Sequence, residues 1–174
     1  MRSIPCLALA LALTAAALPA AQPARILIVT GESDVPFHDW RATTPFIRGV
    51  LENTGRFEVR VTEEARGLTP EGLARYDAVF LNYNGPRWGA GAEAALADFV
   101  RSGKGLVAFH GALYGVLMGT GQKAGGGWQR VAGWSAYPEM LGAEWPPENI
   151  GHGPRHAFAV KLTAGSALAR GMAP

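Results

Sequence analysis

Residues 105–115, GLVAFHGALYG, decide the fold class of this chain. Residues 105–109 form a short apolar run, which is typical of a strand buried on both faces of a parallel sheet. The run ends at His110 and a glycine-rich turn, where many α/β enzymes carry a serine or cysteine nucleophile. The segment therefore predicts a buried strand whose carboxyl end presents a histidine.

Strand-like and helix-like segments alternate before this strand. Apolar runs bounded by glycine predict strands, and Thr-Pro pairs followed by apolar residues at helical spacing predict capped helices. This alternation with short connections predicts an α/β fold with a three-layer, doubly wound, mostly parallel sheet of the flavodoxin-like type. In chain order we expect a strand at 25–31 and then a helix that begins at Thr44-Pro45, carries Phe46, Ile47, Val50 and Leu51 at helical spacing and stops at 53–55. An edge strand at 57–62, a short helix from Thr69 to Tyr76 and a strand at 77–83 follow. The next helix has an inward stripe of Ala95, Leu96, Phe99 and Val100 and ends at Gly103.

The regular pattern stops after the strand at 105–109. Residues 111–134 carry eight glycines without a clear period, so a long surface loop is expected. Loops of this length in compact domains are usually functional or mobile. Beyond the loop, residues 137–141 predict a short helix, and the apolar residues of 157–162 predict a further strand.

The amino terminus resembles a secretory signal peptide. Arg2 precedes an apolar run from Leu7 to Leu18, and small residues follow around Ala20. The run is too short to span a bilayer comfortably, so we expect residues 1–20 to be cleaved and the protein to be periplasmic or secreted, without a membrane span. The single cysteine, Cys6, would leave with this segment, so a cysteine nucleophile or a disulfide is not expected.

Composition and missing motifs exclude several functional classes. The net charge of +2 and the scattered arginines give no electrostatic reason to expect nucleic-acid binding. The chain has no Gly-x-Ser-x-Gly elbow of serine hydrolases and no Gly-x-Gly-x-x-Gly nicotinamide loop after the first strand. Residues 119–123 lack the spacing of a phosphate-binding loop.

Polar and aromatic residues follow three of the predicted strands. In an open parallel sheet, ligands bind at the carboxyl ends of the strands, so these residues are expected to converge. We assign them as follows: candidate catalytic residues His110, His38 and Asp39, and candidate substrate-binding residues Asn82, Asn84, Trp40, Trp88 and Arg87.

His110 suits a general acid or base, because imidazole titrates near neutral pH and can carry a proton at a sugar hydroxyl or carbonyl. Asp39 or Asp34 would orient it. Tryptophans in the loops could stack on a sugar ring. The alternative for each residue is structural: a histidine with satisfied hydrogen bonds, or a tryptophan that covers the end of the core.

A metal site is a third interpretation. Two or three histidines with Asp34 or Asp39 would suit a divalent metal. His152 and His156 are four residues apart, but Gly153-Pro154 between them disfavours a helix, so the spacing is not that of a zinc-protease motif. We therefore assign no metal ligands and no cofactor.

Several segments together resemble the ThuA-like (trehalose utilisation) family. They are ILIVTG at 26–31, FHDW at 37–40, YDAVFLNYN at 76–84 and FVRSGKGLVAFHGA at 99–112. The resemblance implies a fold like that of class I glutamine amidotransferases, with His110 at or next to the place of their nucleophilic cysteine, and hence no glutaminase activity. It also implies a small sugar as ligand, of the trehalose or keto-sugar type.

The chain departs from the family pattern near its end. Ser166-Ala167 stands where relatives tend to carry a His-Pro pair, and the sequence stops at Pro174, which predicts a ThuA-like domain at 25–174 that is truncated at its carboxyl end. We expect an exported domain that acts on or binds sugars. A non-catalytic carbohydrate-binding module and a metal-dependent enzyme remain alternatives, and no oligomeric state is predicted.

Overall fold

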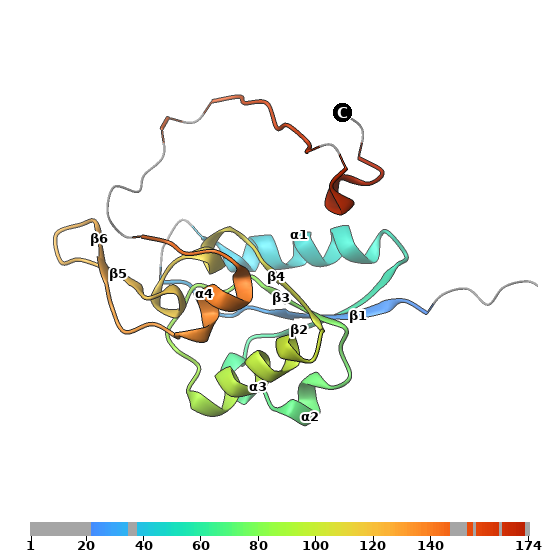
Figure 1. The fold of residues 1–174 in the computed structure, drawn as a ribbon, viewed down its shortest axis with the longest axis horizontal. Coiled ribbons are helices and arrows are strands. Elements are labelled where there is room, and N and C mark those ends of the chain that lie inside the picture. Colours follow the sequence, from blue (N-terminus) through green and yellow to red (C-terminus); the bar gives the residue numbers. More distant parts are fainter. Residues whose placement is uncertain (1–21, 35–37, 147–152, 155, 164, 173–174) are drawn as a thin grey trace, which may run out of the picture.

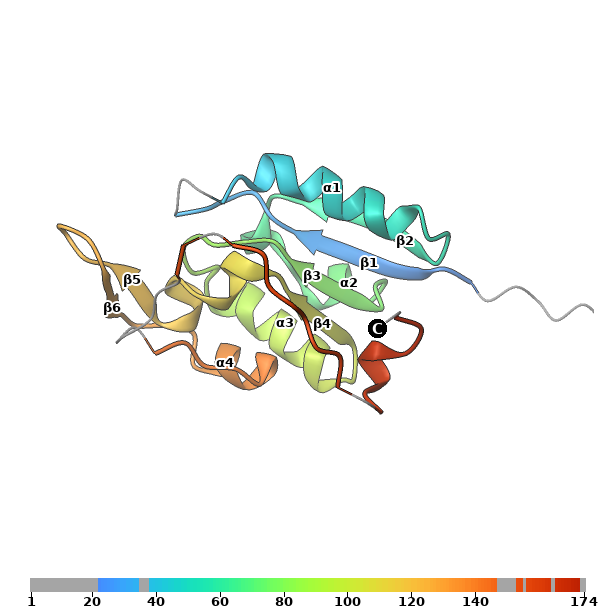
Figure 2. The same ribbon diagram turned by 90° about the horizontal axis from the view of Figure 1, so that it is seen from above.

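The computed structural model describes residues 22–34, 38–146, 153–154, 156–163 and 165–172 (Figure 1). The predicted signal peptide and His152 lie outside these residues. The described chain forms a parallel sheet between two helical layers, with α1 on one face and α2, α3 and α4 on the other (Figures 1 and 2). The expected three-layer α/β fold is confirmed.

The central sheet has four parallel strands in the order β2-β1-β3-β4. This order places β2 at an edge, as its alternating sequence predicts, and β1 and β3 in the middle. The elements in chain order are β1 (Ala24–Val29), α1 (Trp40–Glu52), β2 (Phe57–Thr62), α2 (Pro70–Leu73), β3 (Ala78–Leu81), α3 (Ala90–Arg101), β4 (Gly105–Ala108), β5 (Thr120–Gln122), β6 (Trp128–Arg130) and α4 (Ala136–Leu141).

Helix α1 begins at Trp40, five residues before the predicted first helical residue, Pro45. The side chain of Asp39 accepts hydrogen bonds from the amides of Arg41 and Ala42, which makes Asp39 the N-cap. Thr44, expected as the cap, is instead buried inside the helix, where its hydroxyl lies 2.9 Å from that of Thr30 on β1. A stronger capping residue earlier in the chain and a tertiary contact together override the local Thr-Pro signal.

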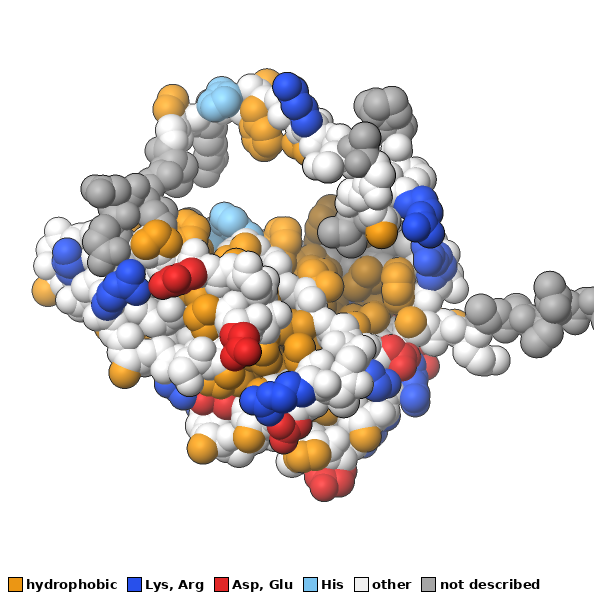
Figure 3. Space-filling view, viewed as in Figure 1, with side chains coloured by type: hydrophobic (Ala, Val, Ile, Leu, Met, Phe, Trp, Pro, Cys, Tyr) orange, Lys and Arg blue, Asp and Glu red, His pale blue; other side chains and the backbone are white. Residues whose placement is uncertain are grey.

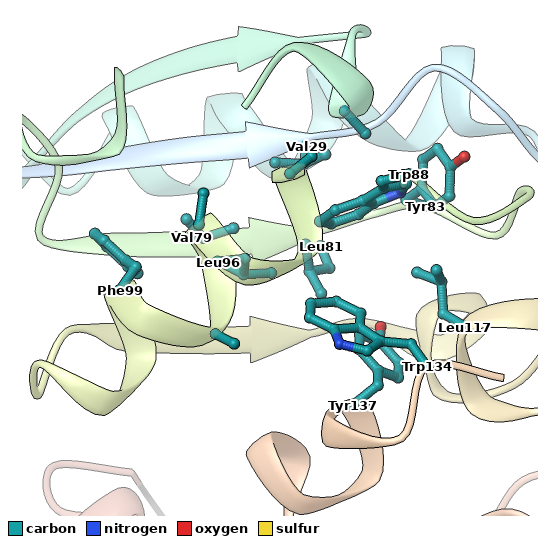
Figure 4. Close-up of a cluster of buried hydrophobic side chains, with 14 of the residues drawn as sticks. Val29, Val79, Leu81, Tyr83, Trp88, Leu96, Phe99, Leu117, Trp134 and Tyr137 are labelled. Atoms are coloured by element: carbon teal, nitrogen blue, oxygen red, sulfur yellow. The ribbon is translucent and has the colours of Figure 1, made fainter. Parts of the chain in front are cut away.

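The larger part of the core lies between the sheet and the α3 side (Figure 4). Strand residues on this face alternate with residues of the opposite face, as the pleat requires. The cluster includes Val29, Val79, Leu81, Leu96, Phe99, Trp134 and Tyr137.

The core on the α1 side is smaller. It consists of four buried residues: Ile26, Ile28, Ile47 and Val59. Because α1 lies over β1 and β2, side chains on the same face of β4 stay exposed, and Figure 3 shows hydrophobic side chains at the surface beneath the arch of the C-terminal segment. Strand β4 is the other edge of the sheet and Val107 is 49% exposed, so the prediction that this strand is buried on both faces is wrong. Phe46 and Val50 of α1 share the helical spacing of Ile47 and Leu51 but are 71% and 53% exposed.

The segment after β4 is more ordered than the expected loop. It contains two short 3₁₀ helices, His110–Leu113 and Val116–Met118, followed by the antiparallel hairpin of β5 and β6. Leu117 and Trp134 are buried in the core, so the segment is not a pure surface loop. The sequence did not predict this packing, because the many glycines interrupt the hydrophobic period from which helices and strands are predicted.

The predicted helix at 137–141 is confirmed as α4, but the predicted strand at 157–162 is wrong. That segment is exposed and has no regular structure, with Phe158 78% exposed, and it arches away from the sheet (Figure 1). Its alternating residues have no neighbouring strand to supply backbone partners. Among the described residues, no helix is long and apolar enough to cross a bilayer.

Candidate functional site

The carboxyl ends of β1, β3 and β4 meet at one edge of the sheet. Val29 pairs in register with Leu81, and Leu81 pairs with Ala108, so the three strands end at the same level. A further parallel bridge joins Ser33 to Asn84 beyond the strand ends. The loops that carry the candidate residues therefore start close together, as the fold prediction requires.

His110 is the first residue of the turn that follows β4. Its φ of 42° is the single positive value at a non-glycine position in the described part of the chain. Such a backbone conformation costs free energy for a residue with a Cβ and is concentrated at functional sites. The side chain is exposed at the strand end, so the strained turn presents the imidazole to solvent.

His38 lies directly against His110. The ring centroids are 4.4 Å apart with an angle of 25° between the planes, which is a stacked arrangement. The hydroxyl of Tyr114 lies 2.8 Å from Nε2 of His38. Two imidazoles from segments 72 residues apart in sequence thus face one another, and a buried tyrosine positions one of them.

Gly111 makes room for the His38 ring. A Cβ added at this glycine would overlap Nδ1 of His38. The backbone of Gly111 does not lie in the left-handed region, so the imidazole alone requires a glycine here. A small depression of about 10 Å³, room for roughly one water molecule, lies beside the ring. Its lining residues are Glu32, Ser33, His38, Trp40, Asn82, Tyr83, Asn84, Gly111 and Ala112.

The surroundings of His38 favour its neutral form. Partial burial, and then the neighbouring His110, lower the pKa of His38 below its usual 6.5. Burial raises the pKa of Tyr114 to about 12, so this phenol keeps its proton at neutral pH. A neutral imidazole is the form that a general base requires, and the tautomer of His38 decides whether Nε2 accepts from the Tyr114 hydroxyl or donates to it.

Asn82 and Asn84 follow β3, but their amides have different partners. The Asn82 amide donates to the hydroxyls of Thr43 and Thr44, at 2.9 Å each, and so holds α1 against the sheet. The Asn84 amide donates to the carbonyls of Gly111 and Tyr114, at 2.5 and 2.9 Å.

The other half of the Asn84 side chain is unsatisfied. The residue is 5% exposed, and its Oδ1 has no hydrogen-bond partner among the described residues. Asn84 is thus both a support of the β4 turn and the source of a buried acceptor, and a buried acceptor without a donor is costly.

Asp39 and Trp40 adjoin His38 in sequence. The carboxylate of Asp39 is the helix cap described above, and this is the role that the structure gives it; it fixes the backbone directly after His38. Trp40 lines the depression beside His38, and the Arg41 guanidinium lies over the indole, 4.2 Å from its centroid.

Arg87 and Trp88 lie apart from the histidine pair. Arg87 forms an ion pair with the buried Glu93 of α3 and donates to the carbonyl of Gly133. Trp88 is 3% exposed and packs against Trp134 in the core. The structure therefore brings His38, Asp39, Trp40, Asn82, Asn84 and His110 to one edge, but not these two residues.

Sequence reasoning missed Tyr114 and the cavity beyond it. The Tyr114 ring contacts the indole of Trp128 edge-on, with centroids 5.2 Å apart. The tyrosine stands four residues after His110 in the opening segment, which was the available signal. Next to it lies a cavity of about 230 Å³ lined by Asp34, Asn84, Gly115, Val116, Thr120, Gly121, Gln122 and Trp128.

A metal centre gains no support from side-chain grouping. Within residues 22–34, 38–146 and the described parts of the C-terminal segment, no three His, Cys, Asp or Glu side chains are close enough to hold an ion. His156 lies in the exposed C-terminal segment, with Nδ1 2.7 Å from the carbonyl oxygen of Ala157.

Comparisons with known proteins agree with this architecture. Among solved structures, the chain is similar to a ThuA-like protein of Bacteroides uniformis, with 21% identity and a TM-score of 0.52 over 75% of this chain and 52% of that one. It is also similar to a ThuA-like protein of Parabacteroides merdae, with 22% identity and a TM-score of 0.46 over 64% of this chain and 48% of that one. The chain thus spans about half the length of these proteins. No curated protein matches it.

The family comparison covers most of the sequence. The family model named ThuA and described as trehalose utilisation matches residues 25–163, which include all of the sheet except the first residue of β1, and both stacked histidines. The chain therefore belongs to the ThuA (trehalose utilisation) family.

Proposed function

We propose that this protein acts on a sugar by proton transfer at a hydroxyl or carbonyl group, with His38 and His110 as the pair that carries the proton. The observation that supports the proposal is the stacked imidazole pair, 4.4 Å between centroids, in which His110 is held in a strained backbone. The proposed ligands are disaccharides of the trehalose type or their keto derivatives, in keeping with the family description.

The two histidines take different roles in this proposal. His38 is the base, because its lowered pKa leaves it unprotonated at neutral pH and the Tyr114 hydroxyl orients it. His110, at the exposed end of β4, is the second group of the pair and donates a proton to the sugar or accepts one from it. Asp39 is a positioning residue that acts through the helix cap. We expect no glutaminase activity, since a histidine stands where a cysteine would be needed.

The residues around the pair complete the proposed site. Trp40 and Asn84 line the depression beside His38, and Asn82 holds α1 in place. Arg87 and Trp88 are not included, because their groups are engaged in an ion pair and in the core. We also propose that the protein is exported, on the basis of the signal-like residues 1–20; fractionation of cells that express the full chain tests this.

The test of the function is turnover of a panel of trehalose and keto-disaccharides by His38→Ala and His110→Ala. Loss of a general acid or base lowers the rate by about 10²–10⁴-fold, and we expect losses in that range for both variants. His156→Ala is the matched control, because it removes an exposed histidine outside the site. Unchanged turnover in either site variant would remove that residue from the mechanism.

Gly111→Ala tests the pair without removing either imidazole. The added methyl group displaces the His38 ring, while the backbone accepts alanine. We expect turnover to fall with little change in fold, as judged by circular dichroism. If the variant retains full turnover, the observed stacking is not the catalytic arrangement.

A non-catalytic sugar-binding module is the second candidate. The depression beside His38 has room for about one water molecule, whereas the neighbouring cavity, which Trp128 lines, is larger. This difference in volume favours sugar binding in the larger cavity over catalysis at the histidine pair. Calorimetric titration with trehalose, followed by long incubation and product analysis, separates the two. Binding without product supports the module, and the absence of binding counts against both.

A further inference from the structure

The cavity of about 230 Å³ beside the histidine pair is outside the catalytic proposal. It shares Asn84 with the depression next to His38. Tyr114 also joins the two places, because its hydroxyl contacts Nε2 of His38 while its ring contacts Trp128. A ligand in this cavity, called here the Trp128 cavity, would lie one side chain away from the proposed base.

The lining of the Trp128 cavity combines polar and apolar groups and carries no positive charge. Among its lining residues, Asp34, Asn84 and Gln122 carry carboxylate or amide oxygens, and Trp128 carries an aromatic face. No lysine or arginine is among these lining residues. Such a surface suits an uncharged ligand with several hydroxyl groups, and it disfavours a phosphorylated one.

One acceptor in the lining lacks the donor it needs. Oδ1 of Asn84 is buried and has no partner among the described residues. Asp34 is exposed and supplies a carboxylate at the edge of the same cavity. A ligand hydroxyl group that donates to Asn84 would offset the penalty of its buried oxygen, and a second hydroxyl group can donate to Asp34.

Backbone contacts fix the positions of these acceptors. The amide of Asp34 donates to the carbonyl of Asn84 at 2.6 Å, which holds Asp34 at the end of β3. Thr120, on the far side, hydrogen-bonds the amide of Gly115 at 2.7 Å and so holds the hairpin against the β4 turn. The lining is therefore a formed site rather than a gap between loops.

The volume limits the ligand. Pockets that enclose drug-sized molecules measure about 300–1,000 Å³, so about 230 Å³ leaves room for one sugar ring and not for two. A pyranose ring has an apolar face for an indole and a rim of hydroxyl groups for the acceptors.

We propose that the Trp128 cavity binds a single uncharged pyranose ring, with Trp128 against the ring face and Asn84 and Asp34 as acceptors for its hydroxyl groups. The inference rests on the proposed function, which it deepens: one ring of a disaccharide occupies the cavity and the group next to it reaches the histidine pair. The protein then recognises one monosaccharide unit and discriminates poorly between disaccharides that differ in the second ring.

Calorimetric titration of the full chain with D-glucose, trehalose and D-glucose 6-phosphate tests the ligand class. We expect glucose and trehalose to bind with dissociation constants within about tenfold of each other, and the phosphate to bind at least about tenfold more weakly. Binding of trehalose without glucose, tighter binding of the phosphate, or no binding of any of the three overturns the proposal.

Trp128→Ala tests the location, and Trp145→Ala is the matched control. Both indoles contact Tyr114, but Trp128 lines the cavity and Trp145 does not. We expect Trp128→Ala to raise the dissociation constant for glucose by about tenfold or more and Trp145→Ala to change it by less than about threefold. Equal effects, or no effect of Trp128→Ala, contradict the assigned cavity.

Asp34→Asn gives a second readout that does not remove an aromatic core contact. Asp34 is exposed on a loop, so the variant keeps the fold, and we expect about three- to tenfold weaker glucose binding because a charged acceptor is lost. His110→Ala separates the two proposals: it abolishes turnover but leaves glucose binding within about threefold if both are right. If no variant or wild-type protein turns over a sugar while Trp128→Ala still weakens binding, the catalytic proposal fails and this one stands.

Discussion

The loop after β3 and the segment after β4 start at neighbouring strand ends and contain similar residues, but they serve different purposes. In the first, Trp88 is buried against Tyr83 and Trp134, with centroids 5.5 and 5.9 Å apart. In the second, His110 is exposed in a strained turn, and Trp128 is half-buried beside a cavity. Trp88 in the first segment closes the core, whereas the second segment both supplies core residues such as Leu117 and Trp134 and presents polar groups to a ligand-sized space.

The comparison shows that the partners of a side chain, rather than its type or its position in the sequence, distinguish a residue that stabilises the fold from a residue of the candidate site. The charged group of Arg87 is satisfied by Glu93 and by a backbone carbonyl. In the same loop, Asn84 leaves a buried oxygen without a donor among the described residues, and after β1 His38 stacks on the imidazole of His110. Nε1 of Trp88 is also buried without a partner among the described residues, but it lies in the core, so unmet hydrogen-bonding capacity marks the candidate site only where it adjoins a cavity.

The largest expected effect is on stability, from Trp88→Ala. Removing a buried indole costs about 3–5 kcal/mol, because it deletes packing and leaves a cavity. The corresponding Trp128→Ala should cost less than about 1 kcal/mol, since that side chain is half-buried at the surface. Urea denaturation of both variants measures this, and similar losses would erase the distinction between the two segments.

Arg87→Met should lower the free energy of unfolding by about 2 kcal/mol. It leaves the Glu93 carboxylate buried and unpaired, although Arg87 itself is 37% exposed and the loss is smaller than for a fully buried pair. The ion pair lowers the pKa of Glu93, so the free energy of unfolding that the pair contributes is present above about pH 4.5 and is lost on acidification. The stability of the variant should not show this acid-dependent loss. Arg48→Met, in an exposed pair of α1, is the control and should change stability by at most about 0.5 kcal/mol.

His110→Asn should raise the free energy of unfolding by about 1 kcal/mol while abolishing turnover. Asparagine adopts a positive φ more readily than histidine does, so the variant relieves strain at the functional turn. His156→Asn, at an exposed position outside the turn, should leave both quantities unchanged. A destabilised His110→Asn would show that the imidazole itself supports the fold.

The smallest expected effect is a pH dependence. The native pKa of His38 is below its unfolded value of about 6.5, so the unfolded chain binds the proton first and stability falls as the pH drops through and below 6.5. Because the side chain is partly exposed, we expect less than about 1 kcal/mol between pH 7.5 and 5.5. Comparison of the wild type with His38→Gln isolates this contribution, and identical pH curves would contradict it.

Most of the fold could be predicted from local patterns. The buried strands and the helix with Ala95, Leu96 and Phe99 carry clear periodicities, and short connections leave few topologies open. The predictions of the start of α1 and of a strand at 157–162 were wrong for the same reason. In both, tertiary surroundings decide the outcome: Thr44 bonds to β1, and the alternating residues near the C-terminus have no adjacent strand.

The candidate site was predictable in position but not in detail. Parallel strands that end together account for the convergence of His38 and His110. The stacking of the rings, the φ of His110 and the hydroxyl of Tyr114 depend on side-chain placement that no sequence period encodes. Trp88 shows the opposite error, because this indole, predicted from its loop position to bind a substrate, is part of the core.

Asn84 fastens three segments at once. Its backbone amide donates to the carbonyl of Glu32 and its carbonyl accepts from Asp34, while its side chain holds two carbonyls of the β4 turn. These loops can therefore loosen only together, so their amide protons should exchange with deuterium as one cooperative unit. A fluctuation that opens the sheet edge at Asp34 would then also part the two imidazoles.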